Sequence, residues 1–159
     1  MRSSRIDIVN RTRTPVPAAW LVRPARAAGR VLVRRLGIRR IGISLVGTAR
    51  MRALNRRWRA ADRPTDVLSF RGSRRFVWPQ ATGAEAEVVL ALPVARRQAR
   101  LHRVTLREEL ARLVIHAMAH LAGFDHERSE REARRMAAIE TRIFHTVNPV
   151  RAKKKRILR

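Results

Sequence analysis

Three of the five histidines in this 159-residue chain fall within residues 116–126, HAMAHLAGFDH. His116 and His120 are four positions apart, so on a helix their rings project from one face about one turn apart. Gly123 allows the chain to leave the helix and turn back, which would bring His126 to the same place. Three neutral histidines can hold Zn²⁺ and leave a fourth position for water. The spacing therefore predicts a site for one Zn²⁺ ion, with His116, His120 and His126 as ligands.

A simpler interpretation is that two histidines on an apolar helix are core residues bonded to backbone carbonyls. The third histidine, the turn glycine and Asp125, a carboxylate that could hydrogen-bond to a ligand, favour the metal. Ala117 occupies the place where H-E-x-x-H peptidases carry their general base, which disfavours a peptidase of that class. His102 and His145 have no comparable neighbours in the sequence and are expected to be surface or packing residues.

The composition indicates a polyanionic partner. Lys and Arg number 37 against 12 Asp and Glu, a formal net charge of +25, and lysine occurs only at 153–155. Nucleic acid is the first candidate, because arginine grips phosphate oxygens in pairs. An anionic membrane and an arginine-rich codon bias are the alternatives. The chain has no cysteine, which excludes disulfides and thiolate metal sites. No apolar run approaches about 18 residues, so we expect a soluble, cytoplasmic protein without a membrane partner.

The elements that must position the histidines can be outlined from periodicity and capping residues. We expect strands at 5–10, 41–47, 67–70 and 88–92, and helices at 18–36, 49–58 and 94–101. Thr105 with Glu108, and Ser129 with Glu132, form capping boxes for a helix through Leu121 and another through about Val147. The fold class is α+β, a single domain over 1–147 with a mixed sheet of about four strands and several helices. Residues 148–159 should be a basic, disordered tail.

Two motifs resemble those of a known family. HAMAHLAGFDH resembles the H-G-x-x-H-x-x-G-[YF]-D-H signature of the YbeY endoribonucleases, the rRNA maturation factors. LNRRWRAADRPTDVLSF, at 54–70, resembles their second signature, L-N-x-x-[FYW]-R-x-x-D-x-P-T-[DN]-V-L-S-F. AEVVLALPVARRQA is similar to a third family segment, more loosely. The resemblance covers roughly residues 5–147.

The resemblance implies a zinc-dependent enzyme that cleaves single-stranded RNA. It further implies a role in maturing the small-subunit (16S) ribosomal RNA 3′ end and in ribosome quality control, with ribosomal RNA and the small subunit as partners. His116, His120 and His126 match the family's metal ligands, and Arg59 matches the arginine of its active-site cleft. Three departures, Ala60 and Ala117 for glycines and Ala86-Glu87 for Gly-Asp, bear on substrate approach and on efficiency.

These residues permit phosphodiester cleavage. Zn²⁺ can polarise a phosphoryl oxygen and lower the pKa of bound water toward about 7. Arg59 would stabilise the charge that builds up on the non-bridging oxygens of the phosphate. His116 is also predicted to be catalytic, as one of the ligands of the metal. Metal-bound hydroxide, Asp125 and Glu127 are alternative general bases.

Aromatic residues are candidates for binding unpaired bases. Phe76 and Trp78 lie in an arginine-rich loop and are candidates for stacking on RNA bases. Trp58 and Phe70 are expected in the core. Two rival functions stay open. One is a non-catalytic, RNA-binding ribosome assembly factor in which the metal has only a structural role, and the other is a metal hydrolase that acts on another substrate.

Overall fold

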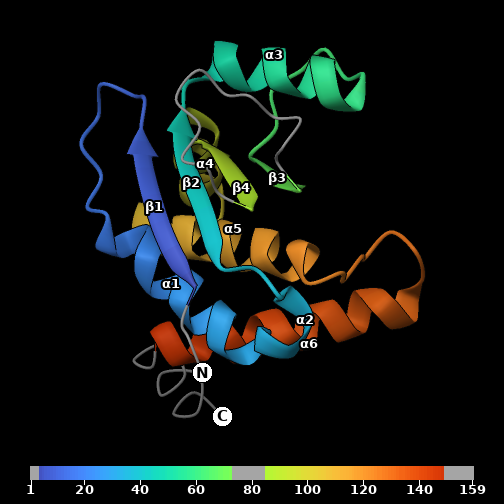
Figure 1. Cartoon of the computed structure of the whole chain (residues 1–159). Coiled ribbons are helices and arrows are strands. Elements are labelled where there is room, and N and C mark those ends of the chain that lie inside the picture. Colours follow the sequence, from blue (N-terminus) through green and yellow to red (C-terminus); the bar gives the residue numbers. More distant parts are fainter. Residues whose placement is uncertain (1–3, 73–84, 149–159) are drawn as a thin grey trace.

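The chain folds around a four-stranded mixed sheet in the order β1-β2-β4-β3 (Figure 1). A computed structural model describes residues 4–72 and 85–148. β1 (Arg5–Asn10), β2 (Arg40–Val46) and β4 (Ala86–Ala91) run parallel, and β3 (Val67–Arg71) pairs antiparallel with β4. The sheet and its helices confirm the α+β class. Phe76, Trp78 and the basic tail from 149 onward lie outside the described residues, and the domain boundary at 147 stays a prediction.

Helices bury both faces of the sheet. The helices are α1 (Ala19–Val31), α2 (Val33–Leu36), α3 (Thr48–Arg59), α4 (Leu92–Leu101), α5 (Leu106–Leu121) and α6 (Glu130–Val147). The larger core lies between one face of the sheet and α1, α5 and α6. A smaller core lies under α3, which crosses beyond the arrowheads of β1 and β2 in Figure 1.

The central strand β4 shows why its sequence is apolar throughout. Val88 and Leu90 point into the larger core, whereas Val89 and Ala91 point into the smaller one. Successive side chains of a strand alternate between faces, so a strand covered on both sides needs apolar residues at every step. β4 ends at Ala91, one residue before the predicted end, because Pro93 occupies the first turn of α4 and Leu92 already belongs to that helix.

The helix predicted over 18–36 is two helices. The chain breaks at Leu32, whose φ of −96° and ψ of 6° are not helical, and α2 then ends at Gly37 with a φ of +57°. The break keeps both Leu32 and Leu36 in the larger core. Pro24 is a buried residue within α1, in its second turn.

Side-chain capping sets where α5 and α6 begin. The Thr105 hydroxyl accepts the Glu108 N–H at 3.2 Å and the Glu108 carboxylate accepts the Thr105 N–H at 2.9 Å, as the predicted capping box requires. At α6 only half of the second box forms: Ser129 accepts the Glu132 N–H at 3.2 Å, while the Glu132 carboxylate binds Arg135 at 2.9 Å instead. Within the described ranges, every helix is too short or too polar to cross a membrane.

Candidate metal centre

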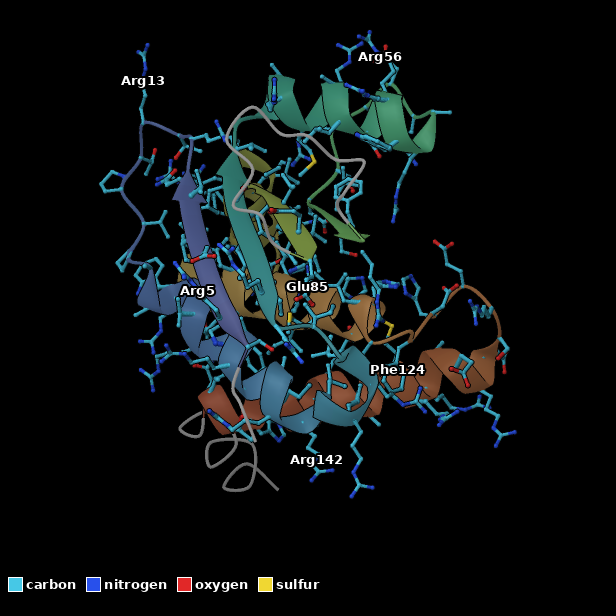
Figure 2. All side chains as sticks on the ribbon, viewed as in Figure 1. Arg5, Arg13, Arg56, Glu85, Phe124 and Arg142 are labelled. Atoms are coloured by element: carbon cyan, nitrogen blue, oxygen red, sulfur yellow. The ribbon has the colours of Figure 1, made fainter. Side chains whose placement is uncertain are left out.

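The turn after α5 brings the three histidines together. Gly123 has a φ of +88°, and its N–H donates to the His120 carbonyl at 2.9 Å. The Phe124 N–H donates to the Ala119 carbonyl at 3.1 Å, which completes the double hydrogen bond of a Schellman helix end. Figure 2 labels Phe124 beside α2, where the Arg35 guanidinium lies 4.8 Å from the centre of its ring. The predicted turn at Gly123 is confirmed, and buried Phe124 anchors the loop that carries His126.

An arginine from the sheet also fixes the end of α5. Arg71, the last residue of β3, donates to the Leu121 carbonyl and to the Leu36 carbonyl, both at 2.8 Å. Its guanidinium therefore ties the last turn of α5, which holds His120, to the end of α2. Sequence reasoning missed this contact, because the two carbonyls come from helices 35 and 50 residues away.

The histidine nitrogens are spaced for a shared cation. His116 Nε2 lies 3.2 Å from His120 Nε2, and the candidate ligand atoms of all three histidines lie within 4.8 Å of one another. Two nitrogens bound to one Zn²⁺ at tetrahedral angles are separated by about 3.3 Å, from a Zn–N bond of about 2.0 Å. The pair on α5 thus already has the required spacing. His126 is exposed on its loop. Its ligand nitrogen lies at most 4.8 Å from those of His116 and His120, so it has to move toward them by about 1.5 Å at most to reach the spacing of about 3.3 Å.

His120 is held ready to bind a cation. Burial lowers the pKa of His120, and the neighbouring charges of His116 and His126 lower it further. The ring therefore stays neutral at neutral pH, which is the protonation state a metal ligand needs. The two Nε2 atoms face each other at 3.2 Å, so a cation can bind between them at nearly the same separation.

A carboxylate that sequence reasoning missed holds His116. His116 Nδ1 lies 2.7 Å from Glu140 Oε1, which comes from the middle of α6. Glu140 follows buried Met136 by four residues and precedes buried Ile143 by three, so it lies on the inward side of α6. An acidic residue among the apolar positions of a helix was the feature of the sequence that could have drawn attention to Glu140. The sequence alone could not show which side chain it would contact.

Asp125 stabilises the loop. Its Oδ1 accepts the Glu127 N–H at 3.0 Å and its Oδ2 binds Arg128 Nε at 3.2 Å. The backbone hydrogen bond from Glu127 is the main cause of a lowered pKa for Asp125. The carboxylate also acts on the charge of His120, although it makes no hydrogen bond to a histidine in the described part of the chain.

Arg59 ends α3 and is exposed to solvent. In the view of Figure 1, the C-terminal ends of α3 and α5 point to the same side of the molecule. Arg59 makes no ion pair within residues 4–72 and 85–148, so its guanidinium remains available to an anion. The following residue, Ala60, has a φ of +53°, a left-handed conformation that favours glycine. The neighbouring Trp58 is 40% exposed rather than in the core as expected, because α3 buries only Met51, Leu54 and Asn55.

The aromatic pair beside Arg59 is edge to face. The ring centres of Trp58 and Phe70 lie 5.8 Å apart, and Phe70 packs against the smaller core. The expectation of a core position is thus met in part by Phe70 and is wrong for Trp58.

A second polar group continues along α5 from the histidines. Glu109 has a side chain only 1% exposed, and Arg112 donates to its Oε1 at 2.6 Å. His102 Nδ1 lies 3.2 Å from the other carboxylate oxygen, and the His102 side chain is half exposed, so His102 is a surface residue with a partner in α5. Glu109, Arg112, His116 and His120 follow one another at helical spacing on one face of α5.

Comparisons with known proteins identify relatives of this chain. The family model described as Endoribonuclease YbeY matches residues 24–148. The Endoribonuclease YbeY of Persephonella marina is 40% identical over 107 residues, which is 66% of this chain and 68% of that protein. The Endoribonuclease YbeY of Aromatoleum aromaticum is 37% identical over 145 residues, 89% of this chain and 83% of that protein.

A solved structure supports the fold. The solution structure of TM1509 from Thermotoga maritima superposes with a TM-score of 0.57 at 24% identity, over 88% of this chain and 87% of that chain. The match of the family model, which includes all three histidines, together with the extent of the Aromatoleum match, goes well beyond the short motifs. This chain belongs to the YbeY family of endoribonucleases.

Proposed function

We propose that this chain is a zinc-dependent endoribonuclease that cleaves single-stranded RNA. We further propose that it acts in the cytoplasm, on the 3′ end of small-subunit (16S) ribosomal RNA and in ribosome quality control. The observation that carries the proposal is the spacing of His116, His120 and His126 at the turn between α5 and α6. Family membership supports the reaction class, and the basic composition supports the substrate class.

The donor set of the site favours zinc. Three imidazoles without a carboxylate ligand suit Zn²⁺ better than Mg²⁺ or Ca²⁺, which prefer oxygen ligands. When bound, the ion would supply Lewis acidity that polarises a phosphoryl oxygen and acidifies a coordinated water. The residues around it have their own tasks: His116 and His120 face each other from adjacent turns of a rigid helix, and His126 closes the site from the loop.

Arg59 is assigned to the phosphate group. An exposed guanidinium without an ion pair in the described part of the chain can donate in pairs to the non-bridging oxygens of a phosphodiester. Loss of one donor of this kind typically costs about 10²–10³-fold in rate at comparable sites. The proposed stacking of RNA bases on Phe76 and Trp78 concerns residues outside the described ranges and remains a prediction.

The positive charge of the surface favours binding of RNA in general, but it is not concentrated in one groove. Figure 2 shows Arg13, Arg56 and Arg142 pointing outward from three different sides of the molecule. An envelope of cations raises affinity for any polyanion and makes it depend on salt. Selection of single strands must therefore come from the surroundings of the histidines and Arg59, rather than from total charge.

The test compares cleavage of one labelled RNA in single-stranded and duplex form. Arg59→Glu should lose cleavage by at least about 100-fold while keeping its fold and bound metal. Arg56→Glu is the matched control, because it makes the same charge reversal on the exposed side of the same helix. We expect it to retain cleavage within about tenfold at moderate salt. Equal cleavage by the two variants would show that Arg59 is one cation among many. Wild-type protein that cleaves no faster than Arg59→Glu, both at background, would favour the RNA-binding assembly factor.

The ribosomal part of the proposal needs a separate experiment in cells. Depletion of the protein should lead to small-subunit RNA with an extended 3′ end, and expression of wild type, though not of Arg59→Glu, should restore the mature end. Unchanged 3′ ends after depletion would contradict the assignment to ribosomal RNA and leave the nuclease activity to be matched with another RNA.

A further inference from the structure

The carboxylate of Glu140 lies between α6 and the first histidine of α5. Its Oε1 is 2.7 Å from His116 Nδ1, and the two side chains are only 29% and 26% exposed. Such a short contact between an imidazole N–H and a carboxylate is a charge-assisted hydrogen bond, about twice as strong as one between neutral groups. The contact joins residues 24 positions apart, so it depends on how the two helices pack.

We propose that Glu140 is a positioning residue that directs His116 toward the metal. A carboxylate can only accept, so the proton of neutral His116 must lie on Nδ1. That leaves Nε2 with its lone pair free, and Nε2 is the atom that faces His120 at 3.2 Å. Glu140 therefore fixes both the tautomer and the rotation of the ring. The inference rests on the metal site of the proposed function, though not on cleavage of RNA.

The nearest alternative is that Glu140 merely holds α6 against α5. The apolar contacts already do this, because Met136 and Ile143, one turn on either side of Glu140, are almost fully buried in the larger core. A carboxylate on such a stripe loses hydration, a cost that only a specific partner offsets. Arg112 lies close enough, on the preceding turn of α5, for its positive charge to interact with the Glu140 carboxylate.

A carboxylate behind a histidine ligand also makes the imidazole a stronger donor. Loss of such a partner typically lowers metal affinity about 10–100-fold. Glutamine at the same place can still accept the Nδ1 proton through its amide oxygen but lacks the negative charge. The two substitutions therefore separate the hydrogen bond, which sets orientation, from the charge, which strengthens the ligand.

The first experiment measures zinc affinity at pH 7.5 by competition with a chromophoric chelator. We expect Glu140→Ala to bind zinc about 10–100-fold more weakly than wild type and Glu140→Gln to fall less than about tenfold. Glu130→Ala is the control, since Glu130 lies on the same helix, is exposed and pairs with Arg134 one helical turn away. It should match wild type. Glu140→Ala within about threefold of the control would overturn the proposal.

A second measurement needs no metal and no substitution. Nitrogen chemical shifts of the histidine rings in the chelator-treated wild-type protein report which ring nitrogen is protonated. The proposal requires the Nδ1–H tautomer for His116, and an Nε2–H tautomer would overturn it even if Glu140→Ala failed to fold. The two proposals can fail separately: a protein that loses zinc affinity in Glu140→Ala and yet cleaves no RNA would support this inference and refute the nuclease.

Discussion

Arg112 neutralises the most deeply buried carboxylate of the described structure, and its removal should be costly. The Glu109 side chain is 1% exposed, and Arg112 donates to the same oxygen of it through Nε at 3.1 Å and Nη2 at 2.6 Å. In Arg112→Met the aliphatic stem keeps much of its volume while the charge and both hydrogen bonds disappear. Among the described residues, Glu109 then keeps His102, at 3.2 Å, as a side-chain partner.

The expected loss follows from burial of the two partners. Removal of one member of a buried ion pair typically costs about 3–5 kcal/mol of unfolding free energy. Here Arg112 is 45% exposed and His102 remains, so water and the imidazole can take over part of the task. We therefore expect about 2–3 kcal/mol, below the range for a fully buried pair. With an m-value of about 2 kcal/mol/M, the urea midpoint falls by about 1–1.5 M.

Urea denaturation followed by circular dichroism measures this loss. Arg134→Met is the matched control, because Arg134 pairs with Glu130 across one helical turn at 3.3 Å on an exposed face, where such pairs contribute about 0.5 kcal/mol or less. Glu109→Gln in the Arg112→Met background removes the stranded charge and should recover about half of the loss. If the unfolding free energies of Arg112→Met and the control differ by less than about 0.5 kcal/mol, burial of Glu109 does not determine the contribution of the ion pair to stability, and the reasoning is wrong.

Three further predictions test other parts of the structure. The lowered pKa of His120 means that, between that value and about 6.5, the unfolded chain binds a proton that the folded chain does not, so stability of the metal-free protein should fall as pH drops below about 6.5. Melting temperatures with chelator from pH 8 to 5 check this, and a His120→Gln variant with the same slope would contradict it. Gly42→Ala should cost about 1–3 kcal/mol, because its new methyl group would overlap the buried Glu87 carboxylate on the neighbouring strand, whereas Gly29→Ala meets open space in α1 and should stabilise by up to about 1 kcal/mol. Chemical denaturation of the two variants should give opposite signs, and equal signs would refute the steric argument. Ala60→Gly should stabilise by about 1 kcal/mol by relieving the left-handed backbone, and a loss of stability on denaturation would contradict that.

Local sequence rules predicted well that the three histidines would lie together. His116 and His120 are neighbours on any helix that contains both, and a glycine with positive φ returns the chain within three residues, so little beyond residues 116–126 was needed. The capping box at Thr105 and the proline in the first turn of α4 were also local signals, and the structure confirms both.

Contacts between distant elements could not be predicted in the same way. Glu140 meets His116 only because α6 packs against α5 with one particular rotation, and Arg71 reaches the end of α5 only because β3 lies at that edge of the sheet. Trp58 misled because its spacing after Met51 and Leu54 suits a buried stripe, although the smaller core ends before it. Periodicity indicates which face of a helix is apolar, but not how far a neighbouring element covers that face.

The most direct test of the central claim measures zinc content and cleavage of a labelled single-stranded RNA in the same preparations of wild type and His120→Ala. A zinc-dependent endoribonuclease should carry close to one zinc per chain and cleave the RNA, and His120→Ala should lose both while Glu130→Ala keeps both. Wild-type protein that carries its zinc and still cleaves no faster than His120→Ala would contradict the claim and make the ion a structural staple.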